Sequence, residues 1–524
     1  MNKQMSDGLI LEEKRIKLQK EIDARQTKIE RNMQGQFATP FKLAVDIIEA
    51  TLKYSDIQIN EVRFLEPAVG LGAFFSAFLK VNKGVKLGYA LGIEKDRKIA
   101  HLSKQLWENQ GIEIINQDFT TCNPPIKEKD KFNTLITNPP YVRHHHLLKE
   151  EKERLIQLVN ENLNLKINGL MGLYGYFLLI SHRWLQKDAL SSWLIPREFM
   201  DVKYGKIIKK YLTEKVKLLQ IHCFDINDVQ FDSAEVTSAV IIYKNTSPNA
   251  SNNIKFTYGS NINHPSIIIE TSLQKLISLE KWSNIVQENT LTLANTFEGT
   301  RLGDIFKVKR GIATGANDFF IINKKIVEKY EIPEKFLIPT LPAPRFLTSR
   351  IIENNSIKNS LENQLFILNC SLDKYDLEKQ YPKTYEYILI GEKKGLNELY
   401  LTKSRNIWYK MEERKPAPII CSYSGRKSKK GESIKFYRNK SKAVVINSYY
   451  NLYPKQIIFE KIDNTEDFFD TIFNELNTIN QSEILKHGRS YGGGLNKIEP
   501  KELENVIIPV KFTELKKPIQ TLII

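Results

Sequence analysis

The residues of this chain with the clearest chemical potential are Asn138, Pro139, Pro140 and Tyr141, which follow the short apolar run 132–136. The run is typical of a buried β-strand, and two prolines end it because proline donates no backbone hydrogen bond. A rigid turn of this kind fixes an amide, a proline carbonyl and an aromatic ring around one small volume. Two acceptors beside a ring suit the exocyclic amine of a flat heterocycle.

Such an amine is a poor nucleophile because its lone pair is delocalised into the ring. Two hydrogen-bond acceptors would draw its hydrogens out of the ring plane and localise that pair, so no covalent nucleophile is required. For the tetrapeptide alone, a strand followed by a surface turn stays an alternative. The chain contains a second Asn-Pro-Pro at 123–125, but Ile126 follows it and no apolar run precedes it. We interpret that second copy as a solvated turn.

Upstream, residues 62–66 predict a strand that leads through a turn at Gly70 and Gly72 into a helix ending near Phe78. Glycines at such a junction let a ligand approach the backbone, and a helix N-terminus favours negative charge. Because Glu66 stands at the mouth of the turn, an amino or sulfonium cation fits better than a phosphate.

Two further predicted strands also end in polar residues. The strand at 88–93 ends in Glu94, which can bind the hydroxyls of a ribose, and the strand at 112–115 ends near Asp118 and Phe119, which can frame an adenine ring. Taken singly, Glu94 could cap a helix and Asp118 could belong to a turn. Ligands of open α/β sheets bind at the carboxyl ends of the strands, so together these positions predict a nucleoside site.

This pattern resembles the gamma group of class I, S-adenosylmethionine-dependent DNA methyltransferases acting on N6 of adenine, typified by the TaqI modification methylase. The order is that of the gamma group: a cofactor motif at 35–40, then the catalytic motif, then a large divergent C-terminal region. Residues 172–177 and 189–199 resemble the next two motifs, and the N-terminal layout is similar to the PstI and BsuBI modification enzymes. The resemblance implies an α/β fold, with a Rossmann-like class I methyltransferase domain before a mixed α+β target-recognition domain.

The resemblance also implies roles for individual residues. The catalytic motif is Asn138, Pro139, Pro140 and Tyr141, and the flipped target base stacks between Tyr141 and Phe231, with Phe224 as the fallback for the latter. The cofactor S-adenosylmethionine is expected to contact Thr39, Pro40, Glu66, Pro67, Ala68, Gly70, Gly72, Glu94, Asp118, Phe119 and Asn138.

Four segments are expected. Residues 1–34 are expected to form an amphipathic helix whose apolar stripe packs against the rest of the same chain. Residues 35–245 are expected to form the catalytic domain. The turn-forming run 245–253 opens a connecting segment at 246–299, and residues 300–524 form the target-recognition domain. The apolar stripe of the helix consists of Leu11, Leu18, Ile22 and Ile29.

Charge favours a polyanionic partner. The 524 residues carry a formal charge of +16, and the stretch 403–442 alone holds 13 Lys or Arg against three Glu. Aromatics interleave with these charges, a pattern that suits phosphate contacts and base reading better than a solvated loop. The aromatics are Trp408, Tyr409, Tyr423, Phe436 and Tyr437. We expect contacts with double-stranded DNA from Lys309, Arg310, Arg426, Lys427, Lys429, Lys430, Arg489 and Tyr491.

Other classes of site are disfavoured. The four cysteines lie far apart without a CxxC pair, and the histidines at 144–146 lack a carboxylate or cysteine partner, so no metal is expected. No signal peptide and no apolar stretch of membrane-spanning length is present, which favours the bacterial or archaeal cytoplasm. Only a short helix precedes Gly35, so any cognate restriction endonuclease is expected to be a separate protein.

The expected activity is methyl transfer to N6 of adenine in duplex DNA, as the modification enzyme of a type II restriction-modification system. Alternatives stay open. Enzymes that methylate RNA or a protein glutamine amide share Asn-Pro-Pro-Tyr, and a DNA-binding protein could retain the fold without catalysis. N4-cytosine methylation is chemically close, although a serine in place of Asn138 would favour it. C5-cytosine methylation would need a nucleophilic cysteine, and Cys122 and Cys223 lie in no matching context.

Overall fold

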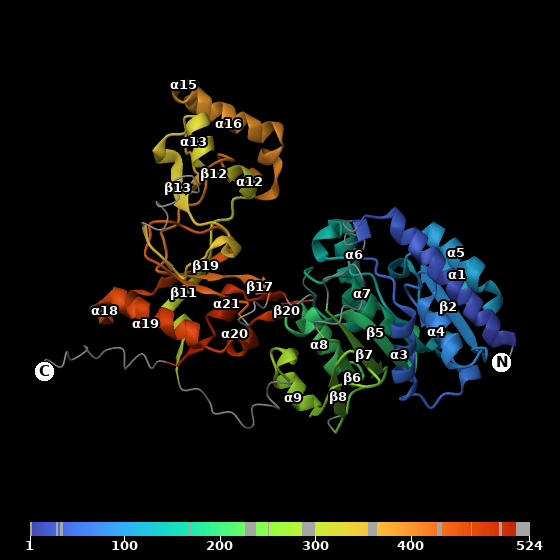
Figure 1. Ribbon diagram of the computed structural model, residues 1–524. Coiled ribbons are helices and arrows are strands. Elements are labelled where there is room, and N and C mark those ends of the chain that lie inside the picture. The colour runs from blue at the N-terminus through green and yellow to red at the C-terminus, as the bar shows by residue number, and fades with distance from the viewer. Residues whose placement is uncertain are drawn as a thin grey trace. The chain divides into compact units, whose positions relative to one another are not determined.

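The computed structural model describes residues 3–27, 30–31, 35–167, 169–225, 237–249, 251–285, 299–354, 364–426, 432–462, 464–491 and 495–509. The chain divides into two compact units, the first comprising Met1–Ala294 with Tyr491–Gly493 and the second Asn295–Ser490 with Gly494–Ile524 (Figure 1).

A nine-stranded sheet forms the centre of the first unit, in the order β3-β2-β1-β4-β5-β7-β6-β8-β9. Strands β1 to β5 run parallel to one another, whereas β7 is antiparallel to both β5 and β6. The carboxyl ends of β1 to β4 therefore share one edge. The strands are β1 (Arg63–Glu66), β2 (Tyr89–Glu94), β3 (Glu113–Asn116), β4 (Phe132–Thr137), β5 (Leu185–Pro196), β6 (Lys217–Cys223), β7 (Ser238–Lys244), β8 (Asn253–Tyr258) and β9 (Ile267–Ser272).

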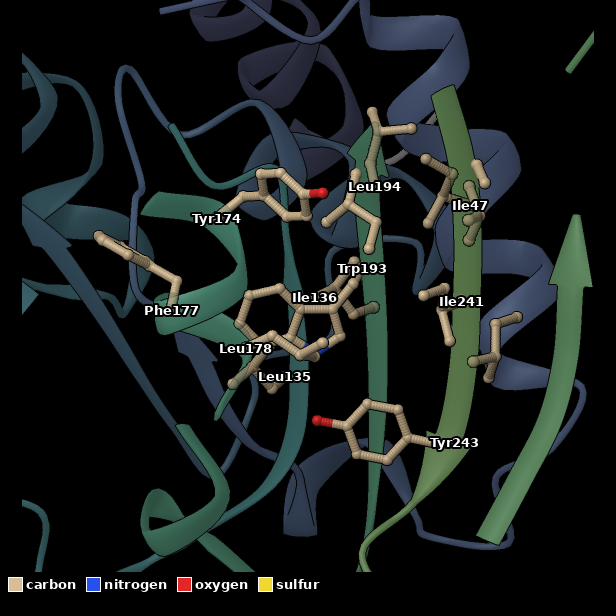
Figure 2. Close-up of a cluster of buried hydrophobic side chains, with 14 of the residues drawn as sticks. Ile47, Leu135, Ile136, Tyr174, Phe177, Leu178, Trp193, Leu194, Ile241 and Tyr243 are labelled. Carbon is tan, nitrogen blue, oxygen red and sulfur yellow. The ribbon is translucent and has the colours of Figure 1, made fainter. Parts of the chain in front are cut away.

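Helices cover both faces of this sheet, so its central strands are continuously apolar rather than alternating. Figure 2 shows side chains of β4, β5 and β7 with Tyr174, Phe177 and Leu178 of α7 and Ile47 of α3, all part of one buried cluster. The helices are α1 (Lys3–Arg25), α3 (Phe41–Leu52), α4 (Ala73–Val81), α5 (Arg97–Trp107), α6 (Lys149–Leu163), α7 (Leu173–Ile180), α8 (Gly205–Glu214) and α9 (Leu273–Ser278).

The second unit combines small sheets with short helices. Its largest sheet has the order β11-β19-β16-β18-β14, and three smaller sheets are β12-β15-β13, β17-β21-β20 and β10-β22. Its strands are β10 (Thr300–Arg301), β11 (Phe306–Arg310), β12 (Ile321–Asn323), β13 (Leu337–Thr340), β14 (Ile351–Ile352), β15 (Leu365–Leu368), β16 (Ile419–Ser422), β17 (Ser424–Arg426), β18 (Phe436–Asn439), β19 (Tyr449–Pro454), β20 (Arg489–Tyr491), β21 (Leu495–Lys497) and β22 (Ile507–Ile508). Its helices are α11 (Leu302–Ile305), α12 (Asn317–Phe320), α13 (Lys324–Lys329), α15 (Lys374–Gln380), α16 (Pro382–Lys393), α17 (Tyr400–Lys403), α18 (Gln456–Lys461), α19 (Thr465–Thr478), α20 (Gln481–His487) and α21 (Pro500–Leu503).

The expected fold class is confirmed, with a Rossmann-like unit and a further mixed α+β unit. The connecting segment expected at 246–299 is wrong in part, because β8, β9 and α9 extend the first sheet by two strands and a helix. The polar residues 245–253 indicated a linker, so the two strands that follow were not predicted. Leu11, Leu18 and Ile22 of α1 pack against the core of the first unit, as expected, while Ile29 lies outside the described residues.

Among the described residues, no helix is long and apolar enough to cross a membrane.

Candidate cofactor and base-amine site

Asn138 follows the last residue of β4 with its amide held in one orientation. Its Nδ2 donates to the backbone oxygen of Phe37 at 2.9 Å and to Thr39 Oγ1 at 3.1 Å. Its Oδ1 is buried and accepts no hydrogen bond from any described residue. A buried acceptor without a partner costs free energy, and a ligand N–H would recover it.

The segment that holds Asn138 is itself attached to the catalytic turn. The Gly35 carbonyl accepts from the backbone N–H of Tyr141 at 2.9 Å, and Gly35 has a φ of +62°. A Cβ at this position would lie 2.4 Å from the Tyr141 carbonyl carbon. Only glycine permits both the left-handed conformation and this close approach.

Tyr141 is buried, and its ring is restrained by several contacts. The hydroxyl donates to the backbone oxygen of Leu194 on β5 at 3.0 Å, and the ring centroid lies 5.6 Å from Phe37 and 6.3 Å from Tyr174. Burial raises the pKa of the hydroxyl, so it stays neutral. The expected stacking partner Phe231 lies outside the described residues, and the fallback Phe224 is buried next to His222.

A pocket of about 660 Å³ opens at the carboxyl ends of β1 to β4. Of the expected cofactor residues, it is lined by Pro67, Ala68, Gly70, Glu94, Asp118, Phe119 and Asn138, and Pro139 and Pro140 also reach it. Thr39, Pro40, Glu66 and Gly72 do not line it: Thr39 holds Asn138, Pro40 precedes α3, and Gly72 packs against Trp107. It is also lined by four residues that were not expected there: Gln19, Ile22 and Asp23 of α1, and Gln26, which follows the helix directly.

Glu66 is only 2% exposed at the end of β1. Burial, followed by the like charge of Glu94, raises the pKa of this carboxyl well above its usual value, against hydrogen bonds from Phe75 and Phe74 and the charge of Arg15. Its Oε2 has no hydrogen-bond partner among the described residues. A buried, unpaired carboxylate oxygen beside the pocket fits a cationic group.

Glu94 and Asp118 differ in protonation tendency. Glu94 accepts from Gly70 N at 3.1 Å and from Asp96 N at 2.8 Å, yet its burial raises the pKa. Burial also opposes ionisation of Asp118, but Lys95 Nζ at 2.9 Å and two hydrogen bonds from Thr120 outweigh it and lower the pKa. Asp118 therefore presents an anionic acceptor.

The expected DNA-contact residues that the structure describes lie on strands, and all of them except Tyr491 belong to the second unit. Lys309 and Arg310 belong to β11, Arg426 to β17, and Arg489 and Tyr491 to β20. Arg310 pairs with Glu499 at 2.8 Å and Arg489 with Glu502 at 3.0 Å. Lys427, Lys429 and Lys430 lie outside the described residues.

The expectation that interleaved aromatics read bases is wrong for four of the five. Trp408, Tyr409, Phe436 and Tyr437 are buried in the cores of the second unit, whereas Tyr423 is half-buried. Arg438, counted in the same basic stretch, is buried and pairs with Glu466 and Asp470 of α19. A local charge count could not include those acidic partners.

Comparisons with known proteins agree along most of the chain. Residues 46–231 match the family model described as Eco57I restriction-modification methylase, and residues 280–523 match the C-terminal domain of type II methyltransferase M.Eco57I. Type II methyltransferase M.AccI of Acinetobacter calcoaceticus is 29% identical over 90% of this chain and 84% of its own length. M.XamI of Xanthomonas campestris pv. amaranthicola is 24% identical over 88% of this chain and 83% of its own length. These matches identify the chain as a DNA methyltransferase that is similar to the gamma-class type II enzymes over most of its length.

A solved structure of the type IIL restriction-modification enzyme MmeI in complex with DNA shares the fold of this methyltransferase, with a TM-score of 0.53 and 12% sequence identity. The match covers 80% of this chain but only 60% of that longer one.

S-adenosylmethionine is the cofactor of this methyltransferase class, and the pocket fits it. The unpaired Glu66 oxygen suits its cationic end, and Gly70, with a φ of +53° and no atom within 4 Å of a would-be Cβ, leaves the turn open to a ligand.

Proposed function

We propose that this DNA methyltransferase modifies the N6 amine of adenine in duplex DNA, as the modification enzyme of a type II restriction-modification system. The observation that carries the proposal is the buried Asn138 Oδ1, which has no hydrogen-bond partner among the described residues while Nδ2 is held by Phe37 and Thr39. The amide is thereby oriented to accept from an amine before any substrate arrives.

Glu66, Glu94, Asp118 and Phe119 would hold S-adenosylmethionine, which supplies an electrophilic methyl group when bound. Glu66 would accept from its cationic end and Glu94 from its ribose hydroxyls. Asp118, kept anionic by Lys95 and Thr120, would accept from its adenine amine. These assignments follow the order in which the strand ends lie across the sheet.

The target adenine must leave the duplex, because its amine cannot reach the pocket inside a base-paired stack. The Tyr141 ring would receive one face of the base, and Phe231 is proposed for the other. Stacking of this kind contributes roughly 1–3 kcal/mol per base, which offsets part of the unstacking cost.

Asn138 Oδ1 and the Pro139 carbonyl would accept the two amine hydrogens and localise the lone pair on N6. That pair would form the new nitrogen–carbon bond as the methyl–sulfur bond of the cofactor breaks and its electrons stay on sulfur, and the nitrogen would then lose one proton to water. Tyr141 takes no part in proton transfer, since burial raises its pKa and its hydroxyl is bound to Leu194. Positioning and electrostatics carry the acceleration.

N4-cytosine methylation is the second candidate, because its substrate also offers an exocyclic amine to Asn138. The asparagine at this position supports adenine through the family resemblance. The type II methyltransferases M.AccI and M.XamI support the role in a restriction-modification system.

The test combines purified protein, labelled S-adenosylmethionine and three acceptors: unmethylated genomic DNA, duplex RNA and bulk protein. After digestion, mass spectrometry of the nucleosides is expected to show N6-methyldeoxyadenosine from DNA only. N4-methyldeoxycytidine would overturn the choice of base, and label confined to RNA or protein would overturn the choice of acceptor.

A further inference from the structure

Two oppositely charged side chains of α1 are buried against the first unit. Arg15 Nε and Nη2 donate to Glu12 Oε2 and Oε1 at 2.8 and 2.7 Å, and the two residues are only 3% and 4% exposed. A buried ion pair is rarely more stabilising than apolar residues of the same size, because desolvation opposes the attraction. Stability alone therefore explains this pair poorly.

The pair is connected to the cofactor site through α4. Ser76 Oγ donates to Glu12 Oε2 at 2.6 Å, and Ser76 follows directly after the two residues whose backbone N–H groups donate to Glu66. Glu12 thus fixes the helix turn that supports the Glu66 carboxyl. The contact joins residues 64 positions apart in the chain.

The pair also acts on Glu66 through its charges. Burial and the neighbouring Glu94 oppose a negative charge on Glu66, while the Arg15 guanidinium and the α4 backbone favour it. Glu12 partly neutralises Arg15, so it moderates this effect. Further along the same helix, Gln19, Ile22 and Asp23 line the pocket.

We propose that Glu12 and Arg15 are a positioning pair that holds Glu66 ready for the cationic end of S-adenosylmethionine. The proposal rests on the role proposed above for Glu66 in holding that end of the cofactor. In this proposal, α1 contributes to cofactor binding by positioning Glu66.

Removing either charge should shift the pH dependence of cofactor affinity, and the two shifts should have opposite signs. If bound cofactor requires an ionised Glu66, affinity rises with pH until Glu66 is ionised in the free protein. Arg15→Met removes the charge that favours the carboxylate, so the midpoint of this rise should move to higher pH. Glu12→Gln leaves Arg15 without its neutralising partner, so the midpoint should move down.

Isothermal titration calorimetry with S-adenosylmethionine, between about pH 5.5 and 8.5, measures these midpoints. The ligand's own titration is common to all variants and cancels in the comparison. Exposed residues of the same helix provide matched controls, Glu13→Gln for the acid and Arg25→Met for the base. The double variant Glu12→Gln/Arg15→Met removes both buried charges and keeps the test informative if Arg15→Met alone fails to fold.

Shifts of opposite sign for Glu12→Gln and Arg15→Met, with both controls unchanged, would support the proposal. Where Arg15→Met does not fold, the double variant should still move the midpoint upward. Equal losses of affinity without a change in midpoint would show a merely structural pair and overturn the inference. The Glu66→Gln variant tests the role of Glu66 separately from that of the Glu12–Arg15 pair. If it leaves the affinity for S-adenosylmethionine and the pH dependence of that affinity unchanged, the proposed role of Glu66 is wrong as well.

Discussion

Asn138 shows how one side chain obtains a chemical direction from its surroundings. Its amide is symmetric in shape, but the acceptors at Phe37 and Thr39 bind the nitrogen end and leave the oxygen end for a ligand. The type of residue was predictable because it follows a buried strand and precedes two prolines. Its partners were not, because Phe37 and Thr39 lie 101 and 99 positions away.

Glu66 should carry a cost in stability when the cofactor is absent. Burial raises its pKa, so the folded protein binds this proton more tightly than the unfolded chain does, and stability is highest when the carboxyl is protonated. The free energy of unfolding should therefore fall as pH rises above the ordinary value of 4.5 toward the folded-state pKa. Glu66→Gln should raise the melting temperature at neutral pH by a few degrees while weakening cofactor binding.

Thermal unfolding without cofactor, followed at several pH values, checks this expectation, and the exposed Glu61→Gln is the control. A Glu66→Gln protein that melts below the wild type at neutral pH would contradict the account.

At the scale of elements, the first four strands were predictable because each contains a short apolar run that is followed closely by an acidic residue or by Asn-Pro-Pro. Predictions of which elements pack together were wrong where local composition was misleading. The polar run at 245–253 indicated a linker although β8 and β9 follow it. The basic stretch indicated aromatics that contact DNA, although four of the five are buried in the cores of the second unit. Burial depends on which elements meet, and no short window contains that information.

The segment before α3 should set the position of the catalytic turn. Gly35→Ala would place a Cβ 2.4 Å from the Tyr141 backbone, so the turn must shift, and methyl transfer should fall by about two orders of magnitude. Gly111→Ala is the matched control, since Gly111 also has a positive φ of +92° but nothing lies within 4 Å of its Cβ position. Single-turnover methyl transfer distinguishes the two. Equal rates in both variants would show that the contact with Tyr141 is unimportant.

At the scale of the whole molecule, the most basic stretch and the cofactor pocket belong to different parts of the chain. The pocket is built from the first unit, whereas the most basic stretch lies in the second. Part of that basic charge is paired within its own unit, as for Arg414, Arg438 and Lys440. Unpaired lysines, rather than the net charge of +16, should therefore determine DNA affinity.

Replacing Lys427, Lys429 and Lys430 with alanine should flatten the salt dependence of DNA binding, because each lost phosphate contact lowers the slope by about 0.9. Lys379, Lys393 and Lys394 of the α15–α16 region are exposed and form a control of equal charge. Fluorescence anisotropy at several salt concentrations gives both slopes. The same decrease in both triple variants would assign the effect to net charge alone.

The central claim is that Asn138 presents its oxygen to the N6 amine of a DNA adenine. The most direct test is modification-sensitive sequencing of genomic DNA from cells that express either the wild type or Asn138→Ala. The wild type should leave N6-methyladenine at one short recurring sequence, and Asn138→Ala, with cofactor binding retained, should leave none. The same adenine marks in both hosts, or methylcytosine in place of methyladenine, would contradict the account.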